Sequence, residues 1–214
     1  MISKTQYISI IILAISLGVL TAIWQINFWM TAIMIFLSVT LIMYIPYVWY
    51  MYFSQDTEKI GAYLKQRTKQ PIIQFYCSLA DSDERGAEEA LHLLKKKYKS
   101  PNITAIFTVA YAALENRLST VRDDILLIKD SSVRQYYEAL LQIEEGHYDE
   151  AEEMSSTLTK PWMGESVKAE LLHKKGLSEQ AAVHETKAIE LTKGMQRYLL
   201  VKKYKSLDTA NPPM

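Results

Sequence analysis

Residues 5–53 contain no aspartate, glutamate, lysine or arginine, and this run constrains the fold more than any other feature of the chain. A helix needs about 20 apolar residues to cross the hydrocarbon core of a bilayer. The run is too long for one crossing and has the length for two. Backbone groups in hydrocarbon must bond to one another, so both crossings should be helices. We therefore expect a transmembrane hairpin over residues 1–53, with helices at about 7–24 and 28–53.

The flanking residues predict the turn and the orientation of this hairpin. The polar step Gln25–Asn27 lies between Trp24 and Trp29, and aromatic residues are typical of the headgroup layer. Lys4 precedes the run, and four basic residues follow it closely: Lys59, Lys65, Arg67 and Lys69. The positive-inside rule then places both termini in the cytoplasm, at a bacterial cell membrane. A cleaved secretory signal is the alternative, but residues 20–24 are too bulky for its cleavage site.

The part of the chain after Phe53 has the composition of a separate helical domain. It contains all 24 acidic residues and every basic residue except Lys4. Glu, Lys, Leu and Ala, the good helix formers, dominate it, so we expect an all-α fold. The single cysteine, Cys77, excludes an internal disulfide and suits a reducing cytoplasm. We expect a linker helix at 54–70, a helical domain at 71–207 and a flexible tail at 208–214.

Two segments thirty residues apart carry a similar motif. The first places Gly-x-Tyr-x-Glu-Ala at residues 146–151, after a helix that contains Ala139. The second is fainter, with Gly176 and Ala181 after a helix that contains Ala169. The pattern resembles the tetratricopeptide repeat (TPR) family over residues 132–160 and more weakly over 162–191, although that family's usual period is 34 residues. The resemblance implies a TPR-like α-solenoid of antiparallel helix pairs.

The resemblance also implies a binding surface, because the first helices of TPR-like repeats line a concave groove for a protein or peptide. By position, it implicates eight partner-binding residues: Tyr136, Leu140, Ile143, Glu144, Ser166, Glu170, His173 and Lys174. Residues 138–153 contain seven acids and no lysine or arginine, whereas the C-terminal helix is basic. A basic peptide in the groove, or association of this acidic segment with the basic end, would fit that asymmetry. We expect a membrane-anchored cytoplasmic interaction scaffold without catalytic activity.

Two other functions remain open from the sequence. Glu-x-x-His occurs at Glu89, Glu144 and Glu170, and this spacing is used in di-iron helical bundles, so a membrane-bound metalloenzyme is one alternative. An accessory subunit of a larger membrane complex, such as a transporter, is the other. No phosphate-binding loop, nucleotide fingerprint or nucleophile elbow occurs, and the balanced charge does not indicate nucleic acid. We therefore expect no cofactor, no metal and no catalytic residue.

The last expected helix, at 194–207, is basic and amphipathic. No acidic residue occurs between Lys193 and Lys205. Such a helix can form the polar cap of a solenoid. It can also lie on an anionic membrane surface, in this chain through Lys202, Lys203 and Lys205.

Overall fold

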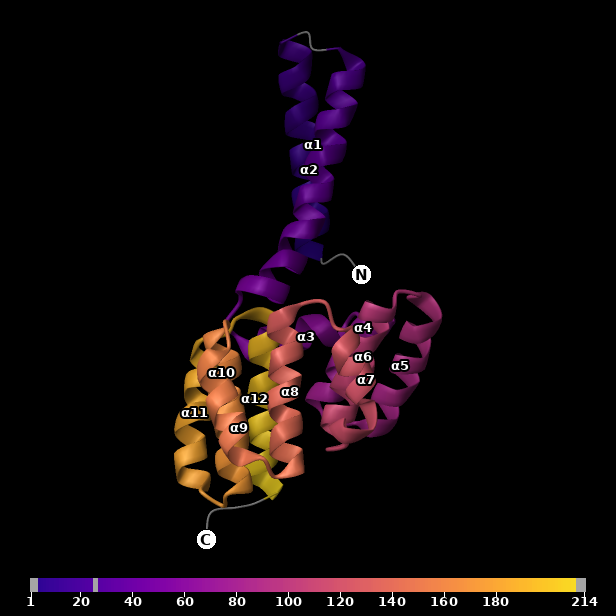
Figure 1. Ribbon diagram of the computed structural model, residues 1–214. Coiled ribbons are helices and arrows are strands. Elements are labelled where there is room, and N and C mark those ends of the chain that lie inside the picture. Colours follow the sequence, from indigo (N-terminus) through magenta and orange to yellow (C-terminus); the bar gives the residue numbers. More distant parts are fainter. Residues whose placement is uncertain (1–3, 25–26, 211–214) are drawn as a thin grey trace. The chain divides into compact units, whose positions relative to one another are not determined.

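The computed structural model describes residues 4–24 and 27–210, and within those ranges every regular element is helical (Figure 1). The all-α class predicted from composition is thus confirmed. The chain divides into two compact units, residues 1–54 and 55–214.

The first unit contains α1 (Lys4–Ile23) and α2 (Phe28–Val48), which contact each other. The Asn27 side chain accepts a hydrogen bond from the Trp29 amide at 2.9 Å and so caps α2. Pro46 does not end the helix, which continues to Val48 and then as a π-helical turn, η1 (Trp49–Phe53). One helical stretch among the described residues, Trp29–Phe53, is long and apolar enough to cross a membrane. Gln25 and Ile26, in the predicted turn, lie outside the described residues.

The second unit is a succession of helices in which each contacts the next along the chain, a pattern compatible with helical repeats. Its elements are α3 (Thr57–Lys65), α4 (Pro71–Ala80), α5 (Glu84–Lys97), α6 (Pro101–Leu114), η2 (Leu118–Val121), α7 (Arg122–Leu127), α8 (Ser131–Glu145), α9 (Tyr148–Thr157), α10 (Pro161–Lys174), α11 (Ser178–Glu190) and α12 (Gly194–Ala210).

Local sequence explains where these helices turn and how closely they approach. Gly146 and Gly176 have φ of 84° and 76°, a left-handed conformation that favours glycine and permits the turns after α8 and α10. Gly164 serves a different purpose, because a Cβ on it would lie 2.5 Å from the backbone oxygen of Ser155. The absence of a side chain there lets α10 pack directly against the backbone of α9.

The last helix departs from simple neighbour-to-neighbour stacking. Besides α11, α12 contacts α3 and α4, the first helices of the unit. Tyr198 is buried beside Gly61 of α3, whereas Leu200 and Tyr204 are buried in a cluster with Ala188 of α11. Repeats of an ideal solenoid contact only adjacent repeats, so α12 adds contacts between segments far apart in the chain.

Two segments have other helix bounds in the structure than the expected ones. The expected linker helix at 54–70 is the shorter α3, which belongs to the second unit because its Ile60 and Leu64 are fully buried and it packs against α12. The expected tail at 208–214 begins too early, since α12 continues to Ala210. Residues 211–214 lie outside the described residues.

Candidate interaction cleft

A cavity of about 340 Å³ lies among α4, α6, α8, α10 and α12, with η2 at its edge. We call it the cleft. The first four of these helices are the leading members of successive helix pairs (Figure 1). Side chains of α12 also line the cavity. Apolar side chains make up much of the lining: Leu79, Ala110, Ala113, Leu114, Leu140, Ile143, Leu199 and Leu200.

Aromatic side chains from α8 and α10 meet in the cleft. The ring centroid of Tyr136 lies 5.7 Å from that of Trp162 and 5.3 Å from that of Tyr137. All three rings are partly buried and line the cavity. Rings at these spacings attract one another and hold fixed positions. The cleft therefore has a preformed aromatic wall.

A buried serine joins three of the surrounding helices. Ser166 on α10 is fully buried, and its Oγ accepts a hydrogen bond from Tyr204 Oη on α12 at 3.0 Å. Tyr136 Oη on α8 lies 3.3 Å from the same oxygen. Burial is the main reason that the pKa of Tyr204 is raised, so its hydroxyl remains a donor at neutral pH.

An ion pair crosses from α10 to α12 in the lining. Lys203 Nζ lies 2.7 Å from Glu170 Oε2. Lys203 is the largest influence on Glu170 and lowers the pKa of that carboxyl group, although burial acts in the opposite direction. Burial is the largest single influence on Lys203 and would lower its pKa, but Glu170, Tyr136 and Tyr204 together outweigh it and the pKa is raised. Both groups are therefore charged at neutral pH.

Glu144, at the end of α8, binds the backbone of a neighbouring turn. Its two carboxylate oxygens accept hydrogen bonds from the amides of Leu118, at 2.7 Å, and Ser119, at 3.0 Å. These amides belong to the first turn of η2, where a negative charge is favourable. Partial burial would raise the pKa of Glu144, but the two amides, the Ser119 side chain and the Lys174 charge together outweigh burial and lower the pKa. Glu144 thus acts as a cap for η2.

The structure brings six of the eight predicted partner-binding residues together in the lining of the cleft. These are Tyr136, Leu140, Ile143, Glu144, Glu170 and Lys174. Ser166 is not in the lining but supports it through Tyr136. His173 points to the second helix of its own pair, where its Nε2 contacts Glu185 of α11.

Sequence reasoning missed the contribution of α12. Gln196, Leu199, Leu200, Lys203 and Ser206 all line the cleft. The signal was present in the tyrosines and leucines interleaved with the lysines, which indicate a helix with a buried face. Two of the three lysines expected at a lipid surface form ion pairs within the domain, Lys203 with Glu170 and Lys202 with Asp81, the latter at 2.7 Å.

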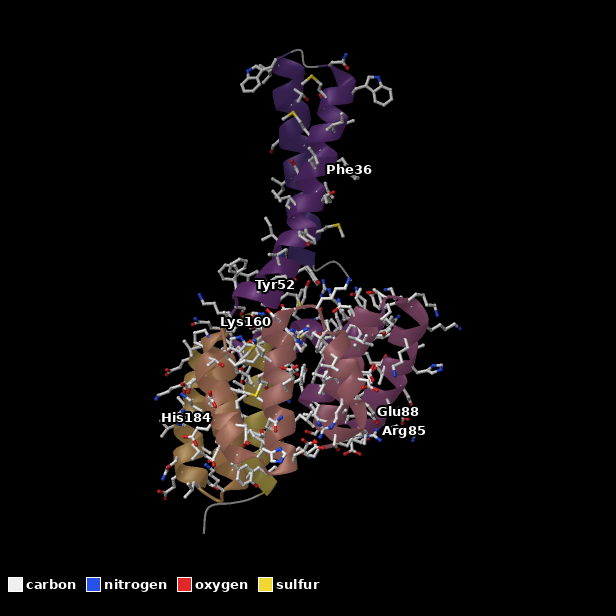
Figure 2. The ribbon with its side chains drawn as sticks, in the orientation of Figure 1. Phe36, Tyr52, Arg85, Glu88, Lys160 and His184 are labelled. Atoms are coloured by element: carbon white, nitrogen blue, oxygen red, sulfur yellow. The ribbon has the colours of Figure 1, made fainter. Side chains whose placement is uncertain are left out.

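The Glu-x-x-His pairs do not assemble. His147 Nδ1 lies 2.8 Å from Gln142 Oε1, and Glu89 forms an ion pair with Arg85. His184 of α11 (Figure 2) lies 2.7 Å from Glu165 of α10. In residues 4–24 and 27–210, no three or more His, Cys, Asp or Glu side chains are grouped to hold a metal ion.

No protein-family model, no curated protein and no solved structure matches the chain.

Ser166, which contacts side chains of α8 and α12 from its place on α10, should stabilise the domain. Ser166→Ala removes the acceptor of a buried tyrosine hydroxyl, so it should lower the free energy of unfolding by about 1–3 kcal/mol. Denaturant titration of the full chain, followed by circular dichroism, measures this. Ser156→Ala is the matched control, because Ser156 is exposed on α9, and it should change stability by less than about 0.5 kcal/mol. Equal effects of the two substitutions would contradict the assigned role of Ser166.

Proposed function

We propose that this protein is a membrane-anchored, non-catalytic interaction protein whose cytoplasmic helical domain holds a segment of a partner protein in the cleft. The observation that carries the proposal is the combination of the charge-free run with a cleft whose lining includes six positions expected for a TPR-like groove. The TPR-like solenoid itself is part of the proposal. It is supported by the thirty-residue recurrence of Gly146 and Gly176 and by the contacts between successive helices.

The proposed anchor is a hairpin of two membrane-spanning helices with both termini in the cytoplasm. A crossing by α2 is supported by the exposure of its side chains. No residue in the apolar window of Trp29–Phe53 is buried, whereas the core helix of a soluble protein is mostly buried. Large apolar side chains such as Phe36 (Figure 2), which is 70% exposed, would otherwise face water. For α1, the support is the absence of charge from Thr5 to Ile23 and its contact with α2.

The properties of the cleft favour a protein segment as its occupant. Aromatic residues such as Tyr136 and Trp162 are enriched among the residues that dominate binding energy at interfaces. Both acids of the lining already have partners. Glu170 forms an ion pair with Lys203, and Glu144 accepts hydrogen bonds from the η2 amides. An apolar segment with few charges therefore fits better than the basic peptide suggested by the acidic stretch alone.

The anchor is tested by labelling cysteines with a membrane-impermeant maleimide in intact cells. In a Cys77→Ser background, Asn27→Cys should react from outside, because residue 27 lies in the turn between the two proposed crossings. Lys69→Cys should react only after the membrane is permeabilised. If Asn27→Cys also required permeabilisation, the two-span anchor would be excluded.

The cleft is tested by filling it. A photoreactive amino acid at Gln196, an exposed position of the lining, should crosslink to the partner in native membranes. Leu199→Trp places an indole in the cleft and should reduce the adducts about tenfold, the effect of losing one strong interface contact.

Val183→Trp supplies the control, because Val183 is exposed on α11 and outside the lining. It should leave the adducts unchanged. Identical adducts from the wild type and both variants would show that the partner does not use the cleft.

A further inference from the structure

A second hollow, of about 550 Å³, lies between α3, α12 and the C-terminal end of α4. We call it the α3–α12 groove. It lies within the second unit, and three lysines line it: Lys65 from α3, and Lys202 and Lys205 from α12. Two acids, Glu58 and Asp81, also line it. Three lysines against two acids leave the lining with one net positive charge.

The lysines of the groove differ in whether they form ion pairs. Lys202 Nζ lies 2.7 Å from Asp81 Oδ1, so these two neutralise each other. The Lys65 ammonium is exposed and forms no ion pair or hydrogen bond with any residue in the described ranges. The groove thus contains a cation, Lys65, that has no ionic partner among the described residues.

A buried tyrosine adds a hydrogen-bond donor to the same lining. Tyr198 is 2% exposed, and its hydroxyl has no hydrogen-bond partner among the described residues. The ring occupies the space left by Gly61, where a Cβ would lie 2.9 Å from the nearest ring carbon. Burial, with smaller contributions from Asp81 and Cys77, raises the pKa of Tyr198 to about 12, so the hydroxyl keeps its proton. An unpartnered buried hydroxyl is unfavourable, and a ligand oxygen would satisfy it.

We infer that the α3–α12 groove binds a phosphate group, with Lys65 and Lys205 supplying positive charge and Tyr198 supplying a hydroxyl donor. Phosphate presents several anionic oxygens, which suits more than one lysine together with a neutral donor. The inference is separate from the proposed cleft, because apart from Ser206 the two hollows share no lining residue. The phosphate comes from a lipid headgroup or from a soluble phosphate.

The assignment to a lipid headgroup rests on the proposed membrane anchor. Thr57, in the lining, follows Phe53 by four residues in the chain. Four residues span at most about 14 Å when fully extended. A chain anchored through Phe53 would therefore keep the start of α3 within reach of the headgroup layer. Helix α12 would then contact lipid through Lys202 and Lys205, because these two lysines line the groove and Lys203 lines the cleft.

Titration calorimetry of the full chain in a non-ionic detergent tests the site with three probes: inorganic phosphate, dibutanoyl phosphatidylglycerol and dibutanoyl phosphatidylcholine. We expect the phosphatidylglycerol to bind most tightly. Lys65→Gln and Lys205→Gln should each weaken its binding about fivefold, as expected for the loss of one lysine beside an anionic group. Lys95→Gln, at an exposed position of α5, should have no effect.

The outcomes separate the two sources of phosphate. Inorganic phosphate that binds as tightly as phosphatidylglycerol, with the same dependence on Lys65, would support the site and assign it to a soluble phosphate. Binding that is absent, or unchanged by Lys65→Gln, would overturn the inference. Leu199→Trp should retain phosphate binding, so the groove and the proposed cleft can fail independently.

Tyr198→Phe distinguishes a binding role from a purely structural one. It keeps the ring beside Gly61 and removes only the hydroxyl. Without ligand, the variant should unfold at the same temperature as the wild type or higher, because an unpartnered buried group is lost. With ligand, its affinity should fall about fivefold, as for the loss of one hydrogen bond. A less stable variant with unchanged affinity would remove Tyr198 from the site.

Discussion

The contacts of α12 are the interactions on which the architecture of the second unit depends. This helix packs against α3, α4 and α11, and two of its side chains reach α10. Arg197 adds hydrogen bonds to the backbone oxygens of Gln55, at 3.1 Å, and Ile189, at 2.6 Å. The bond to Gln55 joins residues 142 positions apart. A row of helices that contact only their neighbours has no such link between its ends.

Helix α12 lines both the cleft and the α3–α12 groove. Lys203 and Leu199 face the cleft, whereas Tyr198 and Lys202 line the groove. Two carboxylates of the cleft lining form contacts within the domain. Glu144 caps η2 and Glu170 binds Lys203, so the cleft is less acidic than the run of carboxylates indicates.

Features determined by local sequence were predictable. The helices after Pro71 and Glu84, and the turn at Gly146, follow from helix-start and turn signals that act over a few residues. The positions of Tyr136 and Leu140 in the cleft followed from helical spacing and the resemblance to a repeat. The contacts of α12 with α3 and α4 were not predictable, because they depend on packing between distant segments. For the same reason, Lys202 and Lys203 looked like free surface charges, although their partners Asp81 and Glu170 precede them by 121 and 33 positions.

The position of α12 is tested most directly by zero-length carbodiimide crosslinking of the full chain in native membranes, with the joined peptides identified by mass spectrometry. This reagent joins an amine to a carboxylate only when the two are in contact. The structure predicts two links from adjacent lysines to different helices, Lys202–Asp81 and Lys203–Glu170, each pair being 2.7 Å apart. Lys175–Glu152, at 3.5 Å on α9 and the end of α10, serves as the internal reference. If that reference link formed while Lys202 and Lys203 joined only other acids, α12 would not occupy the position that defines the cleft and the groove.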